Sequence, residues 1–466
     1  MKNAIGREVP DALDGRPVCA PYAGAFAHLG VVTRAPVRVA SAVPRKGKLL
    51  PDIRAALAAV ELKDGATISF HHHLRNGDQV LNAVLDEIAR LGLRDIGIAP
   101  SSIFPVHAPL AEHIRSGVVA RIHTAYMAGP AAQAVSRGLL PNPAILQTHG
   151  GRARAIESGD LHIDVAFVGA PTADEYGNLN GMDGPSACGS LGYAVADVQY
   201  ADRVVAITDN LVGYPAVPIA IGQDYVDFVV KVDSIGDPRG IVSGTTQPTQ
   251  DPVGLQIART AARVIEASGL LADGFSFQTG AGGISLAVAA AVKDLMQQRG
   301  VKGSFASGGI TGYMVEMLEA GLFKAIFDVQ CFDLKAVDSF RRNDAHMTMS
   351  ASMYANPHNR GAVVNRLDAM ILGATEIDLD FNVNVATGTN GMIMGGSGGH
   401  SDTAAGSKLA LVTTRLTGGG FAKVVSNVTT VTTPGETVDV VATEAVATSG
   451  GNEVTLLRGG DMLFPA

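Results

Sequence analysis

Tryptophan is absent from the 466 residues, and aromatic residues make up only 5% of the chain, while glycine occurs 55 times. A core with so few large rings is filled by aliphatic and small side chains, which favours closely packed α/β layers with many turns. Hydrophobic residues amount to 47% and charged residues to 17%. This balance supports large buried cores and excludes intrinsic disorder over most of the chain.

Cysteine is nearly absent as well. The three cysteines, Cys19, Cys188 and Cys331, lie far apart in the sequence. The chain therefore has neither a disulfide framework nor the paired cysteine spacing of a zinc site. From this we expect a reducing compartment, the cytoplasm, and no metal bound by this chain.

Long apolar runs are missing too. Glycine, proline and charged residues interrupt every stretch that could span a bilayer, and the first ten residues lack the apolar centre of a signal peptide. The net charge of −8 disfavours nucleic acid and anionic membrane surfaces as partners.

What the sequence does contain is a duplication. In the first copy a helix is expected at 81–90, and a short strand follows at 96–99. In the second copy the corresponding helix is expected at 286–298, with a strand at 303–306. Both helices have apolar residues at helical spacing and a glycine just past their ends. One structural unit therefore occurs twice.

The later parts of the two copies also correspond. The segments 188–192 and 395–402 are rich in glycine, and a strand is expected after each of them, at 203–207 and 408–412. Strands that alternate with helices predict βαβ units and mostly parallel sheets. The predicted fold class is α/β, with two similar domains that arose by internal duplication.

Turn residues between 233 and 249 predict the join between these domains. We expect an N-terminal extension at 1–51, a first domain at 52–235 and a second domain at 250–466. In folds of this kind the ligand lies beyond the C-terminal ends of the strands, so a site between the two domains is expected.

The glycine-rich segment 395–402 is the strongest candidate for a functional loop. It follows an apolar stretch that contains Glu376. Glycine lets the backbone approach a ligand closely, so that free N–H groups can hold an oxyanion or a phosphate. The candidate binding residues here are Gly396, Ser397, Gly398, Gly399 and His400. Asp402 is interpreted as the N-cap of a following helix.

Three consecutive histidines, 71–73, follow a predicted strand that ends at Phe70. On a strand their side chains would point to alternate faces, which disfavours a shared metal ion. We instead expect a loop after the strand, in which His72 and Arg75 meet carboxylates.

Two further segments are candidates for anion binding. In the motif HGGR, Gly150 and Gly151 are expected to form a loop. Arg152 or Arg154 either clamps a carboxylate or lies in solvent. Thr279 and Gly280 begin a glycine-rich loop in the second copy, at the position that the histidines occupy in the first. This loop lacks the lysine of a nucleotide P-loop, which disfavours ATP.

Several of these segments resemble the citrate lyase alpha subunit, a family of the CoA-transferase superfamily. The resembling segments are SFHHHLRNGD (69–78), HGGRARAI (149–156), DVAFVGAP (164–171), CGSLGYA (188–194), GFSFQTG (274–280), EID (376–378), FNVNV (381–385) and SGGHSDTA (397–404). The resemblance extends from about Arg38 to Thr443 and implies paired CoA-transferase-like α/β domains. The tail after Thr443 departs from the family's pattern.

The resemblance implies transfer of an acyl thioester. Citrate would displace acetate from the thioester arm of an acyl carrier protein, and a separate beta subunit would cleave the citryl thioester. The implied substrate is a thioester of coenzyme A or of carrier-bound phosphopantetheine, and the implied partners are the beta subunit and the acyl carrier protein (gamma) subunit. Glu376 is the implied catalytic carboxylate. It attacks the thioester in related CoA-transferases, whereas the citrate lyase branch is thought to transfer directly between the two acids.

Two alternatives remain open at this stage. One is a free-standing CoA-transferase, or a citramalate lyase alpha-type subunit, acting on a related di- or tricarboxylate. The other is a non-catalytic scaffold that docks a carrier protein. The combination of Glu376 with the glycine loop argues against the scaffold, and the altered tail favours it.

Overall fold

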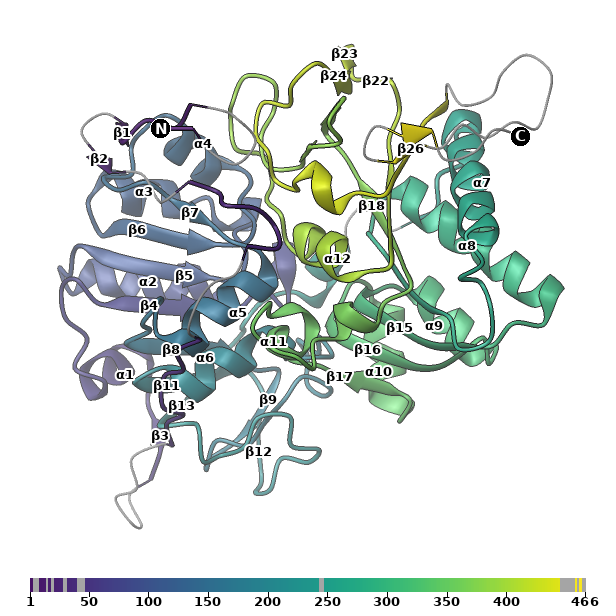
Figure 1. Ribbon diagram of the computed structural model, residues 1–466. Coiled ribbons are helices and arrows are strands. Elements are labelled where there is room, and N and C mark those ends of the chain that lie inside the picture. The colour runs from purple at the N-terminus through teal and green to yellow at the C-terminus, as the bar shows by residue number, and fades with distance from the viewer. Residues whose placement is uncertain are drawn as a thin grey trace.

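Two parallel β-sheets, one from each half of the chain, form the framework of the protein (Figure 1). This computed structural model describes residues 1–2, 8–13, 16–17, 21–27, 32–39, 47–242, 247–444, 457–458 and 461–462. We call 47–242 the first unit and 247–444 the second unit. Cys19 and most of the tail after 444 lie outside the described residues.

The first unit contains an eight-stranded sheet in which every neighbouring pair is parallel. Its strands, in spatial order, are β3 (Leu49–Leu50), β13 (Phe228–Lys231), β11 (Arg203–Thr208), β8 (Val165–Gly169), β4 (Thr67–Phe70), β5 (Ile96–Pro100), β6 (Val119–Thr124) and β7 (Ile145–Leu146). Its central strands are almost wholly buried, as expected for a parallel sheet covered on both faces.

The second unit contains a seven-stranded sheet, again parallel throughout. Its strands, in spatial order, are β25 (Val440–Ala442), β21 (Leu409–Thr413), β18 (Ala369–Gly373), β14 (Ser276–Thr279), β15 (Gly303–Ile310), β16 (Phe323–Cys331) and β17 (His346–Thr348). From β25 to β17 this order repeats the order from β13 to β7. The predicted α/β class and the internal duplication are therefore confirmed, while the domain limits stay a prediction.

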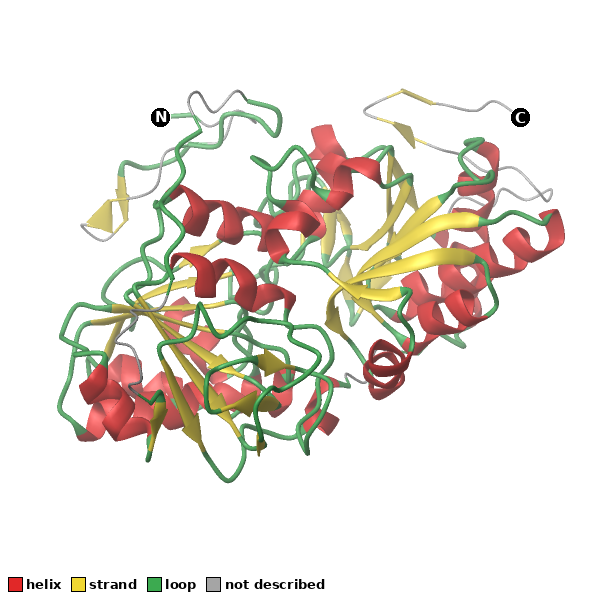
Figure 2. Cartoon of the chain, turned by 90° about the horizontal axis from the view of Figure 1, so that it is seen from below, coloured by secondary structure: helices red, strands yellow, loops and turns green. Residues whose placement is uncertain are grey.

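Helices pack against both sheets, which appear as two fans of strands in Figure 2. Those of the first unit are α1 (Ile53–Ala59), α2 (Val80–Arg90), α3 (Leu110–Arg115), α4 (Pro130–Ser136), α5 (His149–Ser158) and α6 (Val195–Tyr200). Those of the second unit are α7 (Pro252–Ala267), α8 (Gly283–Arg299), α9 (Gly312–Glu319), α10 (Leu334–Arg342), α11 (Ala351–Ala355) and α12 (His400–Gly406). None of the described helices is long and apolar enough to cross a bilayer.

Local sequence signals explain where the helices begin and end, both the predicted α8 and α7, which was not predicted from the sequence. The helix predicted at 286–298 is α8, and Gly300 ends it with a φ of +67°, a conformation that favours glycine. Asp251 begins α7 by accepting a hydrogen bond from the N–H of Gly254, with Pro252 in the first helical position.

Each unit also has a small three-stranded sheet beyond the end of β8 or β18. The strands are β9 (Thr172–Asp174), β10 (Leu179–Asn180) and β12 (Leu211–Val212) in the first unit, and β19 (Glu376–Asp378), β20 (Val383–Asn384) and β24 (Val424–Val425) in the second. Asp174 and Asp378 occupy matching positions, where each accepts hydrogen bonds from the backbone that follows it. The duplication therefore extends to single side chains.

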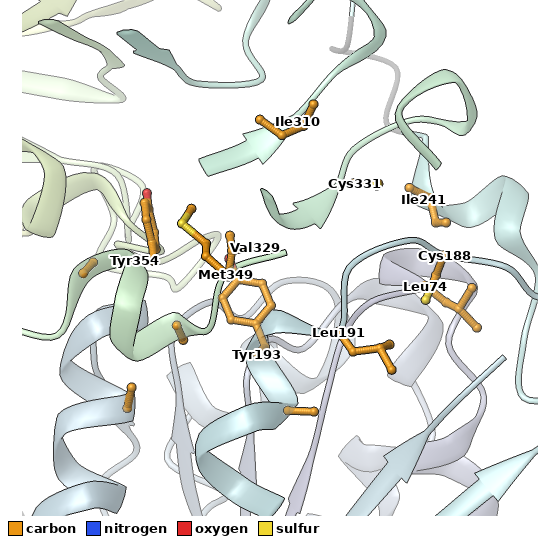
Figure 3. Close-up of a cluster of buried hydrophobic side chains, with 14 of the residues drawn as sticks. Leu74, Cys188, Leu191, Tyr193, Ile241, Ile310, Val329, Cys331, Met349 and Tyr354 are labelled. Carbon is orange, nitrogen blue, oxygen red and sulfur yellow. The ribbon is translucent and has the colours of Figure 1, made fainter. Parts of the chain in front are cut away.

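One continuous hydrophobic core extends across the interface between the two units, which we call the seam (Figure 3). Tyr193 of the first unit lies there beside Met349 and Tyr354 of the second. The glycines of the segment 188–192 allow this close packing, because a Cβ at Gly192 would lie 2.1 Å from the carbonyl oxygen of Met349. The seam is thus a packed interface that fixes one unit against the other.

Candidate active site at the seam

The glycine loop 395–399 lies in the seam and touches the first unit. A Cβ at Gly396 would lie 2.3 Å from the carbonyl oxygen of Ala125, and one at Gly399 would lie 2.3 Å from the hydroxyl of Tyr354. Within the described part of the chain, the N–H groups of Gly396, Ser397 and Gly399 donate no hydrogen bond. They are candidates for oxyanion donors, and this role stays a prediction.

The structure corrects the roles expected for two neighbours in this loop. The N–H of Gly398 donates to the carbonyl oxygen of Ala125 at 3.1 Å, so it is not a free donor. His400 is buried: its Nε2 donates to the carbonyl oxygen of Gly373 at 2.8 Å, and its Nδ1 accepts from Thr433 at 2.7 Å. The side chain of His400 therefore holds the loop in place instead of presenting a free donor.

The motif HGGR is not the loop that the sequence predicted. His149 begins helix α5, and the N–H of Gly150 donates to the carboxylate of Asp402 at 2.9 Å. A carboxyl group of the protein itself thus already occupies this helix end. Gly150 also approaches α11, where a Cβ would lie 1.9 Å from the carbonyl oxygen of Ala355. Asp402 was predicted to cap its own helix, but it caps the helix of the other unit.

Arg152 does not clamp a substrate carboxylate and does not lie in solvent. It is 3% exposed, and its guanidinium makes two hydrogen bonds to Asp197, at 2.9 and 2.6 Å. A third hydrogen bond goes to the carbonyl oxygen of Ala99. His71 reaches the same carboxylate at 3.2 Å. Arg152 is therefore part of a buried ion pair inside the first unit, and both interpretations from the sequence are wrong.

Arg75 shows the opposite arrangement. Its guanidinium lies over the ring of Phe104 from the first unit, at 5.6 Å, and over Phe332 from the second unit, at 4.4 Å. The Nη1 atom is buried and has no hydrogen-bond partner, and no ion pair to Arg75 is found among the described residues. Its backbone is in the left-handed region, with a φ of +52°. A charged group in this situation costs free energy unless a ligand anion pairs with it.

Aromatic side chains link Arg75 to the glycine loop. The ring of Phe104 lies 5.3 Å from that of Tyr126, centroid to centroid. A Cβ at Gly396 would in turn lie 2.8 Å from the Cα of Tyr126, and the N–H of Met127 donates to the carbonyl oxygen of Gly395. The guanidinium of Arg75 and the unpaired N–H groups of the glycine loop thus border the same part of the seam.

His72 and its neighbours form a stack of rings around Tyr193. The ring of Tyr193 lies 4.6 Å from that of His72 and 4.4 Å from that of His149. His72 is hydrogen-bonded to the hydroxyl of Ser101 at 2.6 Å. Burial, with the nearby His149 next in importance, holds the pKa of His72 well below its usual range. His72 is therefore neutral, and any contact that it makes with a carboxylate is a hydrogen bond rather than an ion pair.

We expect these buried histidines to make the protein sensitive to acid. Burial lowers the pKa of His73 and His149 to about 3 and that of His400 to about 4. The unfolded chain binds more protons at these sites between about pH 6.5 and 4, so the free energy of unfolding falls as the pH falls through that window. Three such groups contribute up to about 4 kcal/mol per pH unit.

Asp402 has the opposite effect on the free energy of unfolding. Burial raises its pKa to about 7, so its protonation favours the folded state as the pH falls. Urea unfolding followed at pH 7.5, 6.5 and 5.5 should therefore show a steep loss of stability toward acid. Replacing Asp402 by asparagine should make the loss steeper still. A urea midpoint that stays constant over this range would contradict the neutral buried histidines.

Glu376 begins β19 and is 2% exposed. Burial disfavours its charge, but hydrogen bonds from the amide of Asn384 and from the N–H and hydroxyl of Thr429 outweigh burial and lower its pKa. Its partner Asn384 lies two residues before Ala386, whose carbonyl oxygen accepts from the N–H of Gly395 at 3.1 Å. The carboxylate is therefore ionised and connected to the loop through the segment 384–386, but it is not openly exposed.

The duplication marks Glu376 as special. Its position is that of Thr172 in the first unit, since both residues start the strand that ends in the matching aspartate. The partner asparagines match as well: Asn384 donates to Glu376, whereas the Nδ2 of Asn180 has no partner. Only one of the two matching sites thus carries a carboxylate, which is the pattern expected of a functional substitution in one copy.

Thr279 ends β14, and Gly280 follows it and leads toward α8. The hydroxyl of Thr279 donates to the carbonyl oxygen of Gly280, whose own N–H donates to Ile371. Gly282, the N-cap of α8, has no side-chain cap. The first turn of this long helix therefore presents backbone N–H groups suited to an anion such as a phosphate, and this role stays a prediction.

Sequence reasoning missed Tyr126, Tyr193, Tyr354 and Gln147 as parts of this site. Tyrosine is scarce, with nine in the chain, and three of these residues meet at the seam. Gln147 precedes α5, and its Oε1 is buried without a partner. Tyr193 directly follows the glycine-rich segment 188–192, and this position is the one signal that could have indicated it.

The fold, two α/β units with the same strand order, is shared with solved structures of low sequence identity. The alpha subunit of malonate decarboxylase from Acinetobacter baumannii is similar in structure, with a TM-score of 0.67 over 86% of this chain and 81% of that one, at 17% identity. RipA from Yersinia pestis is similar at a TM-score of 0.60 and 16% identity, over 85% and 89% of the chains. At these identities the likeness concerns the fold alone.

Closer relatives define the family. The family pattern of the citrate lyase alpha subunit matches residues 46–456. The citrate lyase alpha chain of Klebsiella pneumoniae is 46% identical over 421 residues, which cover 90% of this chain and 83% of that protein. A Streptococcus mutans protein, assigned as the alpha subunit of citrate lyase and solved in complex with citrate, has a TM-score of 0.91 at 49% identity, over 95% and 86% of the chains. The chain belongs to the citrate lyase alpha subunit family.

Proposed function

We propose that this chain transfers an acyl thioester from acetate to citrate in the seam between its two units. As a citrate lyase alpha subunit it is the citrate:acyl-carrier-protein transferase component of the complex. The observation that supports citrate as the substrate is the citrate-bound relative at 49% identity, together with the unpaired Arg75 in this chain. Citramalate lyase and scaffold functions are not favoured by these findings.

The reaction needs three things that the seam can supply. A citrate carboxylate must be held, and Arg75 is the free cation for it. The thioester carbonyl oxygen becomes negative when a carboxylate oxygen attacks its carbon, and the N–H groups of Gly396, Ser397 and Gly399 are the free donors for that charge. Glu376, held by Asn384, either attacks the thioester or polarises the reacting groups.

In the direct route the atoms balance without an enzyme adduct. A citrate carboxylate oxygen attacks the acetyl thioester carbon, and the carrier thiolate leaves, which gives a mixed anhydride. The thiolate then attacks the citryl carbonyl carbon, and acetate leaves. The phosphopantetheine arm would lie along the loop from Thr279, with its phosphate at the N-terminus of α8. The acyl carrier protein (gamma) subunit and the beta subunit that cleaves citryl thioester are the partners we propose.

The test is thioester exchange by the purified chain. With an acetylated carrier protein or acetyl-CoA and citrate, citryl thioester and acetate should appear in equal amounts. Citramalate in place of citrate tests which acid is preferred. If no di- or tricarboxylate supports exchange, the proposal is overturned. Efficient exchange with free CoA thioesters, unaffected by a carrier protein, would favour a free-standing CoA-transferase.

A further inference from the structure

A buried cluster of metal-ligating side chains lies at the seam and contains none of the candidate active-site residues. Asp328 and Cys331 come from the end of β16, and His346 begins β17. One possible ligand atom from each of the three lies within 4.8 Å of the others. Asp328 and Cys331 are 0% exposed, and His346 is 3% exposed.

The geometry within the cluster is close to that of a coordination sphere. The Oδ2 atom of Asp328 lies 3.0 Å from the sulfur of Cys331 and 3.1 Å from the Nε2 atom of His346. Zinc bonds of about 2.0–2.3 Å place tetrahedral ligand atoms roughly 3.3–3.6 Å apart, so small shifts would admit an ion. His346 is also oriented as a metal ligand is, because its Nδ1 is hydrogen-bonded at 3.0 Å to the hydroxyl of Ser339.

A second observation points to a cation at this place. The Oδ1 atom of Asp328 is buried and has no hydrogen-bond partner. Arginine and lysine side chains form no ion pair with it in the described part of the chain; its one ion-pair partner there is His346. A buried carboxylate with an unsatisfied oxygen costs free energy, and coordination of a dication would remove that cost.

We propose that Asp328, Cys331 and His346 bind a zinc ion that fixes the seam between the two units. Binding deprotonates the Cys331 thiol, whose proton passes to solvent, so the two negative ligands balance the charge of the ion. The site joins β16 to β17. Ser190 of the first unit contacts the same strands, since its hydroxyl donates to the carbonyl oxygen of Asp328 and is hydrogen-bonded to Thr348.

This role is structural and separate from acyl transfer. A Cβ at Gly189 would lie 2.3 Å from the sulfur of Cys331, so the first unit packs directly on the proposed ligand. Cys188, the residue before it, is buried in the same region (Figure 3). The combination of thiolate, imidazole and carboxylate favours zinc over magnesium or calcium, which prefer oxygen ligands alone. This site could not be predicted from the sequence, because its ligands are spread over 19 residues and lack a paired cysteine spacing.

The test uses the untagged full chain produced in medium supplemented with zinc. After dialysis against a chelator, mass spectrometry of the metal content should find about one zinc per chain, because a buried site exchanges slowly. Production in cobalt medium should give the near-ultraviolet charge-transfer band of a cobalt–thiolate bond. Cys331→Ser and His346→Gln should each remove the metal and the band. A folded wild-type chain that retains no transition metal overturns the proposal.

Two further variants separate a metal site from a hydrogen-bonded core cluster. Ser339→Ala removes only the group that orients His346, and it should weaken zinc retention about 10- to 100-fold in competition with a chelator. His162→Gln is the matched control, because His162 is exposed and belongs to a second cluster, with the partly buried Asp164 and Asp202. That variant should keep its zinc. Loss of the metal from His162→Gln, or its full retention in Cys331→Ser, would place the ion elsewhere and overturn the assignment.

Discussion

Replacing Glu376 by glutamine is expected to lower kcat/KM for thioester exchange by about 10³-fold or more, the range for a group that touches reacting atoms. The substitution is isosteric and removes the charge. It keeps one oxygen that can accept from Asn384 or Thr429, which hold the carboxylate now. Because the hydrogen-bond network is partly preserved, we expect the protein to fold, and initial-rate kinetics on the folded chain measure the effect.

The neighbouring Asp378 supplies the matched control. It is also a buried strand carboxylate, 3% exposed, and it accepts hydrogen bonds from Asp380 and Asn382 as its counterpart does in the first unit. Asp378→Asn should lower stability but leave the kcat of the folded protein nearly unchanged. Equal losses of kcat in the two variants would show that Glu376 is structural. A borohydride-trapped adduct on Glu376 would contradict direct transfer between the acids.

Replacing Arg75 by methionine is expected to lower kcat/KM for citrate about 10²- to 10³-fold, with the thermal midpoint unchanged or raised. Loss of one partner from a desolvated charge pair costs about 2–5 kcal/mol in binding. In the free protein the guanidinium has no anionic partner, so its removal relieves an unpaired, partly buried charge. Kinetics at varied citrate and a thermal unfolding curve measure both effects, and Arg75→Lys should restore part of the activity.

Arg152 provides the contrast for this prediction. It pairs with Asp197 inside the first unit, and removal of one member of a buried pair destabilises a protein by about 3–5 kcal/mol. Arg152→Met should therefore unfold at a much lower temperature, while Arg75→Met should not. If Arg75→Met unfolds as easily as Arg152→Met and the folded fraction keeps full activity, Arg75 has no role in binding citrate.

Much of the fold could be predicted because it depends on local and periodic signals. The helical spacing at 81–90 and 286–298 corresponds to α2 and α8, and the repeated pattern corresponds to two sheets with the same strand order. The position of the histidines just after β4 was also predictable, since a strand of four residues ends at Phe70. Each of these features depends on neighbours in the sequence.

The partners of polar side chains could not be predicted in the same way. Arg75 and Arg152 look alike in the sequence, yet one is unpaired at the seam and the other is bound to Asp197. His400 is another example, because its side chain is hydrogen-bonded to Gly373 and Thr433. Such contacts join residues that are tens of positions or more apart in the sequence, so they cannot be predicted from a local sequence pattern.

The sequence by itself determined the class of fold, its duplication and the segments at which the chemistry gathers, because periodicity and glycine placement act over short distances. Only the tertiary structure decided which cation and which amides remain free, because that depends on how two units pack across one seam. Asp402 illustrates the difference. Its sequence position suggests a cap for its own helix, but the packing brings it to the N–H of Gly150 in the other unit.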